Sequence, residues 1–181
     1  SRLIFDDVQN IYVRFEGGAP TGDPDADSAY DYSGDWYDYL ARGFGRDSYD
    51  NLGANLTNIV HLVDPDSCPN AFGGGGFSYF CNGTATDDIV AHEWGHSLTS
   101  WTSSLVYQNQ AGQLNESYSD VWGELIDLFN GNAAFGGPPG GTSWPKDPTY
   151  VSSGTDTPNS LRTVCVEPSV RWLVGEDSTG F

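Results

Sequence analysis

The pattern of apolar and polar positions divides the chain into a strand-rich first part, a helical middle and an aperiodic remainder. Short runs in which apolar residues alternate with polar ones, or carry β-branched and aromatic side chains, are typical of β-strands. Runs of this kind lie at positions 3–5, 11–15, 57–62 and 77–80. They predict that the first part of the chain forms a β-sheet.

Three segments instead show the spacing of amphipathic helices, in which apolar residues recur three or four positions apart. The first is predicted near residues 33–44, with Ser33 as its N-cap and glycines at its end. The second begins at Asp88, a candidate N-cap, and the third runs from about Leu114 to Phe129. These segments predict helices packed against the sheet.

The remainder of the chain has no period. Residues 131–168 are rich in Gly, Pro, Ser and Thr, and a short apolar segment, "SVRWLVGED", follows them. A long aperiodic stretch of this composition is typical of a surface excursion. The pattern therefore predicts an α+β fold with a β-rich N-terminal part at 1–87, a helix pair at 88–130, and a Gly/Pro-rich excursion with a terminal segment at 131–181.

The charge of the chain narrows the choice of partners. It holds 25 acidic residues against seven basic ones, a net charge of −18. Such a surface repels nucleic acid and anionic membranes. No apolar run approaches the ~18 residues that a membrane-spanning helix needs. We expect no nucleic-acid partner and no membrane partner. The excess of acids instead favours divalent cations or a salty medium, and a solvated acidic surface without further role is the alternative.

Cysteines and sequons point to export. The chain has no methionine, carries the glycosylation acceptor patterns Asn55-Leu-Thr57 and Asn82-Gly-Thr84, and holds three cysteines. We therefore expect a processed, secreted, extracellular protein. Cys68 and Cys81 flank one short segment, so we expect a disulfide between them, which stabilises by ~3 kcal/mol in the chain-entropy model. Three free thiols are the alternative.

Two of the three histidines lie in "HEWGH", residues 92–96. Residues four apart on a helix share a face, so the rings of His92 and His96 can bind one ion, and imidazole nitrogen suits zinc. Glu93 lies one step round the helix, where it can reach a metal-bound water without being a ligand. H-E-x-x-H is a signature of zinc proteases with the glutamate as general base. Two unrelated histidines on a helix are the alternative.

A catalytic zinc site also needs a third protein ligand. Glu116 follows His92 by 24 positions (116 − 92), on the next predicted helix, and Asp120 shares its face four residues later. Glu116 can therefore bind zinc while Asp120 accepts the free N–H of a ligand histidine. The alternative is that both are ordinary surface acids.

"HEWGH" followed by "LVYQNQAGQLNESYSD" resembles the thermolysin-like zinc metalloendopeptidases, the gluzincins of peptidase family M4, with their N-E-x-x-S-D motif. The resemblance covers roughly 30–129 and "RWLVGED". It implies a thermolysin-like fold with the β-rich part packed on a central zinc-binding helix pair. It also implies His92, His96 and Glu116 as zinc ligands, Glu93 as general base, and Asp120 as the partner of His92.

The resemblance implies further roles in peptide-bond hydrolysis by a zinc-bound water. Tyr107 would help to hold the developing oxyanion. Asn70 and Ala71 would pair with the backbone of an extended peptide that lies along residues 70–80. Without the resemblance, Asn70 and Ala71 are better interpreted as a turn before the glycine run.

Calcium is a second cofactor that the resemblance implies. Asp88, Asp127 and Glu176 match positions of calcium ligands in the family, whereas Arg171 and Leu173 stand where two further acids are expected. Arg171 can substitute for a cation. We therefore expect one bound Ca²⁺ or none, rather than a paired site.

The resemblance also implies a C-terminal helical lobe that carries a further histidine and an arginine, and we expect this lobe to be absent from the chain. We expect a nicked enzyme, with a companion C-terminal polypeptide for which Cys165 is a candidate disulfide partner. The alternative function is a non-catalytic, zinc- or calcium-stabilised secreted binding module or an inactive fragment. Glu93 favours the enzyme, because a purely structural site does not need it.

Overall fold

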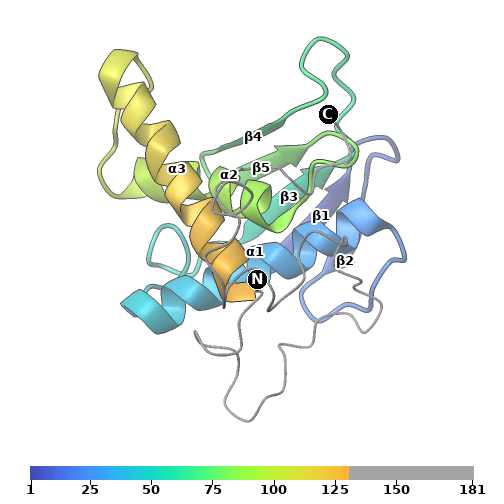
Figure 1. Cartoon of the computed structure of the whole chain (residues 1–181). Helices are drawn as coiled ribbons and strands as arrows, with labels where there is room; N and C mark the ends of the chain where they lie inside the picture. The colour runs from blue at the N-terminus through green and yellow to red at the C-terminus, as the bar shows by residue number, and fades with distance from the viewer. Residues whose placement is uncertain (131–181) are drawn as a thin grey trace, which may run out of the picture.

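The computed structural model describes residues 1–130, with side chains up to residue 127. In this part of the chain, one face of a five-stranded sheet is covered by helices (Figure 1). The elements, in chain order, are β1 (Arg2–Asp6), β2 (Ile11–Phe15), α1 (Pro24–Phe44), β3 (Leu56–Val60), β4 (Ala71–Gly74), β5 (Phe77–Phe80), α2 (Asp87–Trp101) and α3 (Asn109–Asn130).

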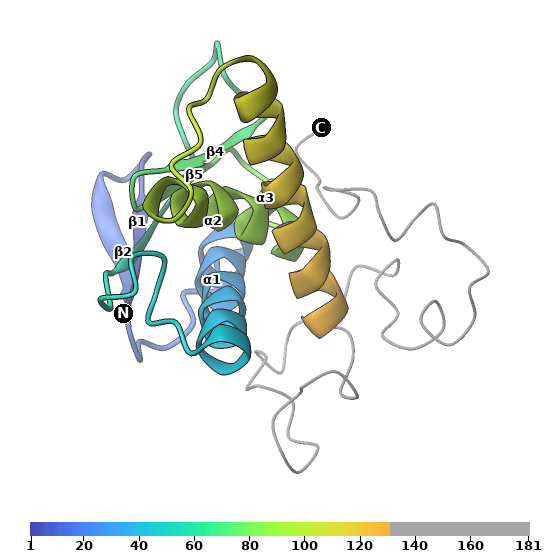
Figure 2. The same ribbon diagram turned by 90° about the vertical axis from the view of Figure 1, so that its left-hand side faces the viewer.

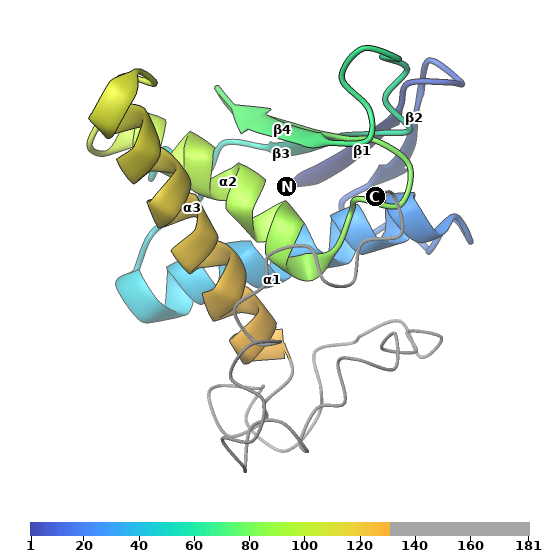
Figure 3. The same cartoon turned by 45° about the horizontal axis from the view of Figure 1, so that its top comes forward.

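The sheet has the strand order β2-β1-β3-β5-β4. β3 pairs in parallel with β1 and with β5, whereas β2 and β4 are antiparallel to their neighbours and form the two edges. Helices α1 and α2 lie against one face of the sheet (Figure 3). Figure 2 shows these two helices between the sheet and α3. β4 is therefore the edge strand nearest to α2.

The first helix begins ten residues before its predicted start. Asp23 is the N-cap, with its side chain accepting from the Ala26 amide, and a proline occupies the first turn. Ser33, the predicted N-cap, is fully buried inside the helix, and its Oγ donates to the Ala29 carbonyl at 2.6 Å. The predicted end is right: Gly45 caps α1 in the left-handed conformation, with φ 64°.

The two later helices also begin earlier than predicted. The N-cap of α2 is Thr86 rather than Asp88, which lies in the first turn and accepts from Thr86 Oγ1 at 2.6 Å and from the Ile89 amide at 2.8 Å. α3 begins at Asn109, five residues before the predicted Leu114. Residues 109–113 contain no large apolar side chain, so the apolar spacing gives no signal there.

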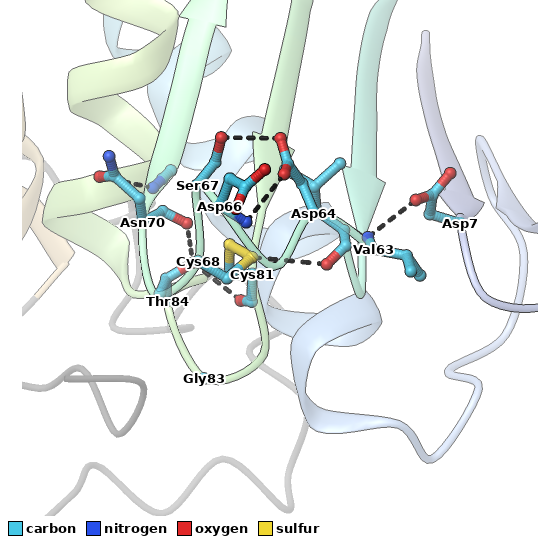
Figure 4. Close-up of a disulfide and its surroundings, with 12 residues drawn as sticks. Asp7, Val63, Asp64, Asp66, Ser67, Cys68, Asn70, Cys81, Gly83 and Thr84 are labelled. Carbon is cyan, nitrogen blue, oxygen red and sulfur yellow. Dashed lines mark hydrogen bonds between the residues drawn. A yellow bond between two sulfur atoms is a disulfide. The ribbon is translucent and has the colours of Figure 1, made fainter.

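Strand β4 is absent from the sequence prediction because its second half consists of glycines, which break the alternation of side chains. The turn that was the alternative for Asn70 and Ala71 is wrong for Ala71, which begins this strand opposite Phe80. The predicted Cys68–Cys81 disulfide is confirmed (Figure 4). Cys165 lies outside the described residues.

Aromatic side chains fix α2 to the rest of the fold. Trp94 is fully buried, and its ring lies 5.9 Å from the Trp36 ring of α1 and 5.8 Å from the Tyr49 ring. Its indole N–H donates to the Asn58 side chain of β3 at 3.0 Å, and Asn58 in turn donates to Ser33 Oγ. Because Trp94 faces the core, the opposite face of α2 points away from the core, and its position relative to the sheet is fixed by these contacts.

Among residues 1–130, none of the helices combines the length and the apolar character needed to cross a lipid bilayer.

Candidate active site

The outward face of α2 carries the two histidines of the H-E-x-x-H motif. Their rings have centroids 4.8 Å apart, and the Nε2 atoms of His92 and His96 lie 3.1 Å from each other. Both side chains are only slightly exposed, at 13% and 12%. The helical spacing thus brings two imidazole nitrogens to one point, as the sequence predicts.

Helix α3 brings two carboxylates to the same point. Glu116 Oε2 lies 3.2 Å from His92 Nε2 and 3.7 Å from His96 Nε2. Asp120 Oδ1 lies 2.9 Å from the other nitrogen of His92, Nδ1. Glu116 therefore faces the two Nε2 atoms, while Asp120 lies on the opposite side of the His92 ring.

His96 has its own partners, which the sequence reasoning missed. Its Nδ1 lies 2.7 Å from Asn115 Oδ1 and 3.1 Å from Ser119 Oγ, and both of these side chains are buried. Asn115 and Ser119 directly precede Glu116 and Asp120 on α3. The same spacing of four that pairs the carboxylates also pairs these two residues, which is the signal that could have found them.

The donor set fits a zinc ion. Asp120 Oδ1 lies 2.9 Å from His92 Nδ1, and Asn115 Oδ1 lies 2.7 Å from His96 Nδ1, so tautomers with Nδ1 protonated leave both Nε2 atoms with their lone pairs. Two such lone pairs and a carboxylate oxygen converge, and a bound cation would satisfy all three. In tetrahedral coordination, ligand atoms ~2.0–2.1 Å from zinc are about 3.3–3.4 Å apart. The separations of 3.1, 3.2 and 3.7 Å bracket this value.

The ionisation of His92 suits the same ion. Burial, reinforced by the neighbouring His96, lowers the pKa of His92 below its ordinary value. A histidine must be neutral to bind a metal, so the fold favours the form that binds.

Glu93 lies beside the donors without joining them. It is 5% exposed, and its Oε2 is buried with no hydrogen-bond partner among the described residues. Burial, together with the charge of Glu116, raises the pKa of Glu93 to about 8. A cation bound nearby would oppose this shift by favouring the carboxylate. The carboxyl group is thus suited to accept and release a proton.

These groups line one cavity of about 600 Å³. Tyr107 extends into the same region, since its hydroxyl donates to Glu116 Oε1 and its ring lies 6.0 Å from that of His96. Asn70 and Ala71 line the cavity from the start of edge strand β4. The structure therefore brings together the predicted metal donors, the predicted base and the predicted substrate edge.

A glycine allows β4 to approach α2. An added Cβ at Gly73 would lie 2.2 Å from the backbone oxygen of Glu93 and 2.7 Å from its Cα. Both are backbone atoms of the helix, so neither can relieve the clash by a change of side-chain rotamer. Gly73 therefore sets the distance between the substrate edge and the base.

Gly73→Ala is expected to destabilise the fold by about 1–3 kcal/mol, because overpacking pushes β4 away from α2. Gly43→Ala is the matched control: it makes the same chemical change in the exposed last turn of α1, where an added Cβ meets nothing within 4 Å. That change is expected to be neutral or to stabilise by up to ~1 kcal/mol. Thermal unfolding of both variants gives the comparison, and equal melting temperatures would contradict this account of Gly73.

The predicted calcium ligands are only partly described. Asp88 is buried at the start of α2, Asp127 lies near the end of α3, and Glu176 lies outside the described residues. Within residues 1–130, the one group of three or more His, Cys, Asp or Glu side chains that could hold a metal ion is His92, His96 and Glu116. Calcium binding remains a prediction.

Known families match most of the chain. Residues 4–100 match the family described as "Thermolysin metallopeptidase, catalytic domain", and residues 103–144 match its "alpha-helical domain". The chain belongs to the thermolysin metallopeptidase family. This result confirms the family that the two sequence motifs indicate. It also shows that the chain includes residues of the family's helical domain, which was expected to be absent. The family's zinc dependence agrees with the donor set of α2 and α3.

Members of the thermolysin metallopeptidase family with known names share over a third of their aligned residues with the chain. "Zinc metalloproteinase" of Renibacterium salmoninarum is 38% identical over 140 residues, which are 68% of this chain and 26% of that protein. "Extracellular elastase" of Staphylococcus epidermidis is 40% identical over 107 residues, 53% of this chain and 21% of that protein. The chain thus spans about a quarter of these relatives or less.

A solved structure of the family shows the same fold. The precursor of protealysin, a metalloproteinase from Serratia proteamaculans, has a TM-score of 0.64 and 38% sequence identity, covering 71% of this chain and 43% of that one. The likeness confirms the predicted thermolysin-like α+β fold.

Proposed function

We propose that the chain carries the metal-binding and proton-transferring part of a secreted zinc endopeptidase. The observation that supports this most is the convergence of His92, His96 and Glu116 on one point, with the buried carboxyl group of Glu93 beside it. A structural zinc site has no need of such a neighbour. Family membership supports the same reaction class. Relatives named extracellular support secretion.

The three donors would hold zinc, which when bound polarises a carbonyl group and acidifies a water molecule. Glu93 accepts a proton from the attacking water and delivers it to the leaving amine. The carboxylate form of Glu93 accepts this proton, and the acid form gives it to the amine nitrogen as the C–N bond breaks. Tyr107 places its hydroxyl at the cavity, where it can donate to the oxygen on which negative charge develops.

The substrate is proposed to bind as an extended peptide along β4. Among residues 1–130, this strand pairs on one side only, with β5, and Ala71 at its start lines the cavity together with the preceding Asn70. An edge strand offers unpaired backbone groups to which another extended chain can add. Such binding would place the scissile bond next to His92, Glu93 and His96 of α2.

Cleavage of a casein-type substrate tests the proposal. We expect activity that a chelator abolishes and that added zinc restores. A chain that binds zinc but cleaves no protein, alone or with other polypeptides of the native material, would support the binding-module alternative. Gels under reducing and non-reducing conditions test the companion polypeptide at Cys165, which remains a separate prediction.

A further inference from the structure

The cavity-facing strand β4 is attached to the fold at each end by different means. Its glycine end is fixed to α2, where Gly73 touches the backbone of Glu93 and the Gly76 amide donates to Ser97 Oγ at 3.3 Å. Its other end, at Asn70 and Ala71, lies beyond this contact. The amino-terminal end of the strand is held by its pairing with β5, where Ala71 lies opposite Phe80, and by one further attachment.

That attachment is the Cys68–Cys81 disulfide (Figure 4). Cys68 comes shortly before β4, and Cys81 directly follows β5, so the bond closes the open end of the β4–β5 hairpin. The Cys81 amide donates to the Asn70 carbonyl at 3.1 Å, and Thr84 Oγ1 lies 3.3 Å from the same oxygen. Cys81 thus hydrogen-bonds to Asn70, the residue that begins the substrate edge, and the cross-link also joins Cys81 covalently to Cys68, two residues before Asn70.

The partners of the disulfide are more firmly held than the strand that it fixes. Cys81 is 2% exposed, and Thr84 is fully buried with its hydroxyl donating to the Cys81 carbonyl at 2.8 Å. Asn70, by contrast, is exposed. Cys81 therefore belongs to the rigid part of the fold, and the disulfide ties an exposed edge to it.

We propose that the Cys68–Cys81 disulfide is a positioning element for substrate, which keeps Asn70 and Ala71 in place as a preformed edge of the cavity. The inference rests on the proposed function. A preformed edge binds more tightly, because an edge that must be ordered on binding loses conformational entropy at that moment. The metal donors lie on α2 and α3, which the disulfide does not touch, so its effect falls on substrate affinity.

The test compares full-length chains with and without the bond. Both chains carry Glu93→Gln, which blocks cleavage, and bind a fluorescent peptide of about eight residues. The dissociation constant of this peptide is expected to be about tenfold higher for the chain that also carries Cys68→Ala and Cys81→Ala. Zinc content should stay the same. With Glu93 intact, KM should rise by a similar factor while kcat changes little. Amide exchange should accelerate at residues 70–74 and not in α2.

Ile4→Ala controls for a general loss of stability. Ile4 is fully buried in β1, which pairs with β2 and β3 rather than with the β4–β5 hairpin, so its truncation lowers stability at a distance from the disulfide. Assayed at equal intervals below the two melting temperatures, this variant should keep the wild-type KM. Thr84→Val is a second test that keeps both cysteines and removes one donor to the Asn70 carbonyl; it should raise the dissociation constant by a smaller factor.

Four results would overturn the inference: unchanged affinity without the disulfide, loss of zinc together with affinity, the same rise in KM in Ile4→Ala, or no peptide binding to either form. Failure of the proposed function looks different. A chain that binds peptide in a disulfide-dependent way, but never cleaves it, would refute the enzyme and leave the positioning role intact.

Discussion

Glu93→Gln is expected to lower the rate of peptide hydrolysis by about 10²–10⁴-fold while the zinc content of the protein stays the same. The amide has the size and planar shape of the carboxyl group, but it cannot accept a proton from water. Glu93 is buried beside the donors and is not one of them. Its replacement should therefore remove the proton transfer and leave the metal site whole.

Glu16→Gln is the matched control for this substitution. Glu16 forms an ion pair with Arg2, at 2.6 Å, in a part of the sheet that does not line the cavity. Turnover and metal content of this variant should equal those of the unmodified protein. Loss of zinc from Glu93→Gln, or turnover close to normal, would contradict the role given to Glu93.

His92→Ala is expected to weaken zinc binding by about two to three orders of magnitude. Zinc bound at structural sites contributes ~10–16 kcal/mol over four ligands, and a quarter of that corresponds to this factor. Stability in the presence of zinc should fall as well, because a metal that binds only the folded chain stabilises it. Asp120→Asn, which changes only the partner of His92, should weaken binding by about 10–100-fold.

His61→Ala separates this effect from the loss of any histidine. His61 lies between Asp6, at 3.1 Å, and Asp23, at 3.3 Å, rather than beside the other two histidines. Its replacement should leave zinc affinity unchanged. Competitive titration with a chromophoric chelator measures all three variants, and equal affinities for His92→Ala and the unmodified chain would refute the assigned site.

The donors of the site could be predicted because helical spacing is a strong constraint. Once residues 92–96 are helical, His92 and His96 share a face, and the same spacing relates Glu116 to Asp120. Partners of His96 were missed because Asn115 and Ser119 are uncharged and carry no motif of their own. Their contact with His96 depends on how α3 packs against α2, which the local sequence pattern does not determine.

The parts of the fold that escaped prediction share a physical cause. The first turns of α1 bury Ala26 and Ala29, which are too small to mark an apolar face against the many acids around them. Strand β4 contains glycines, whose missing side chains erase the alternation on which strand prediction rests. In both places the residues are small, so they leave no apolar or alternating pattern from which the element could be predicted.

The pairing of β1 with β3 sets the order in which the molecule is expected to fold. In this pair Arg2 lies opposite Leu56, so a long loop must close before any of its hydrogen bonds can form. Helices α2 and α3 are neighbours in the chain and pack directly on each other. Contacts between distant segments form more slowly than local ones. We expect pulse-labelled amide exchange to show protection in these helices before the sheet; the reverse order would contradict this. A folding chain would then gather its metal-binding groups before the central strands that support the substrate edge are paired.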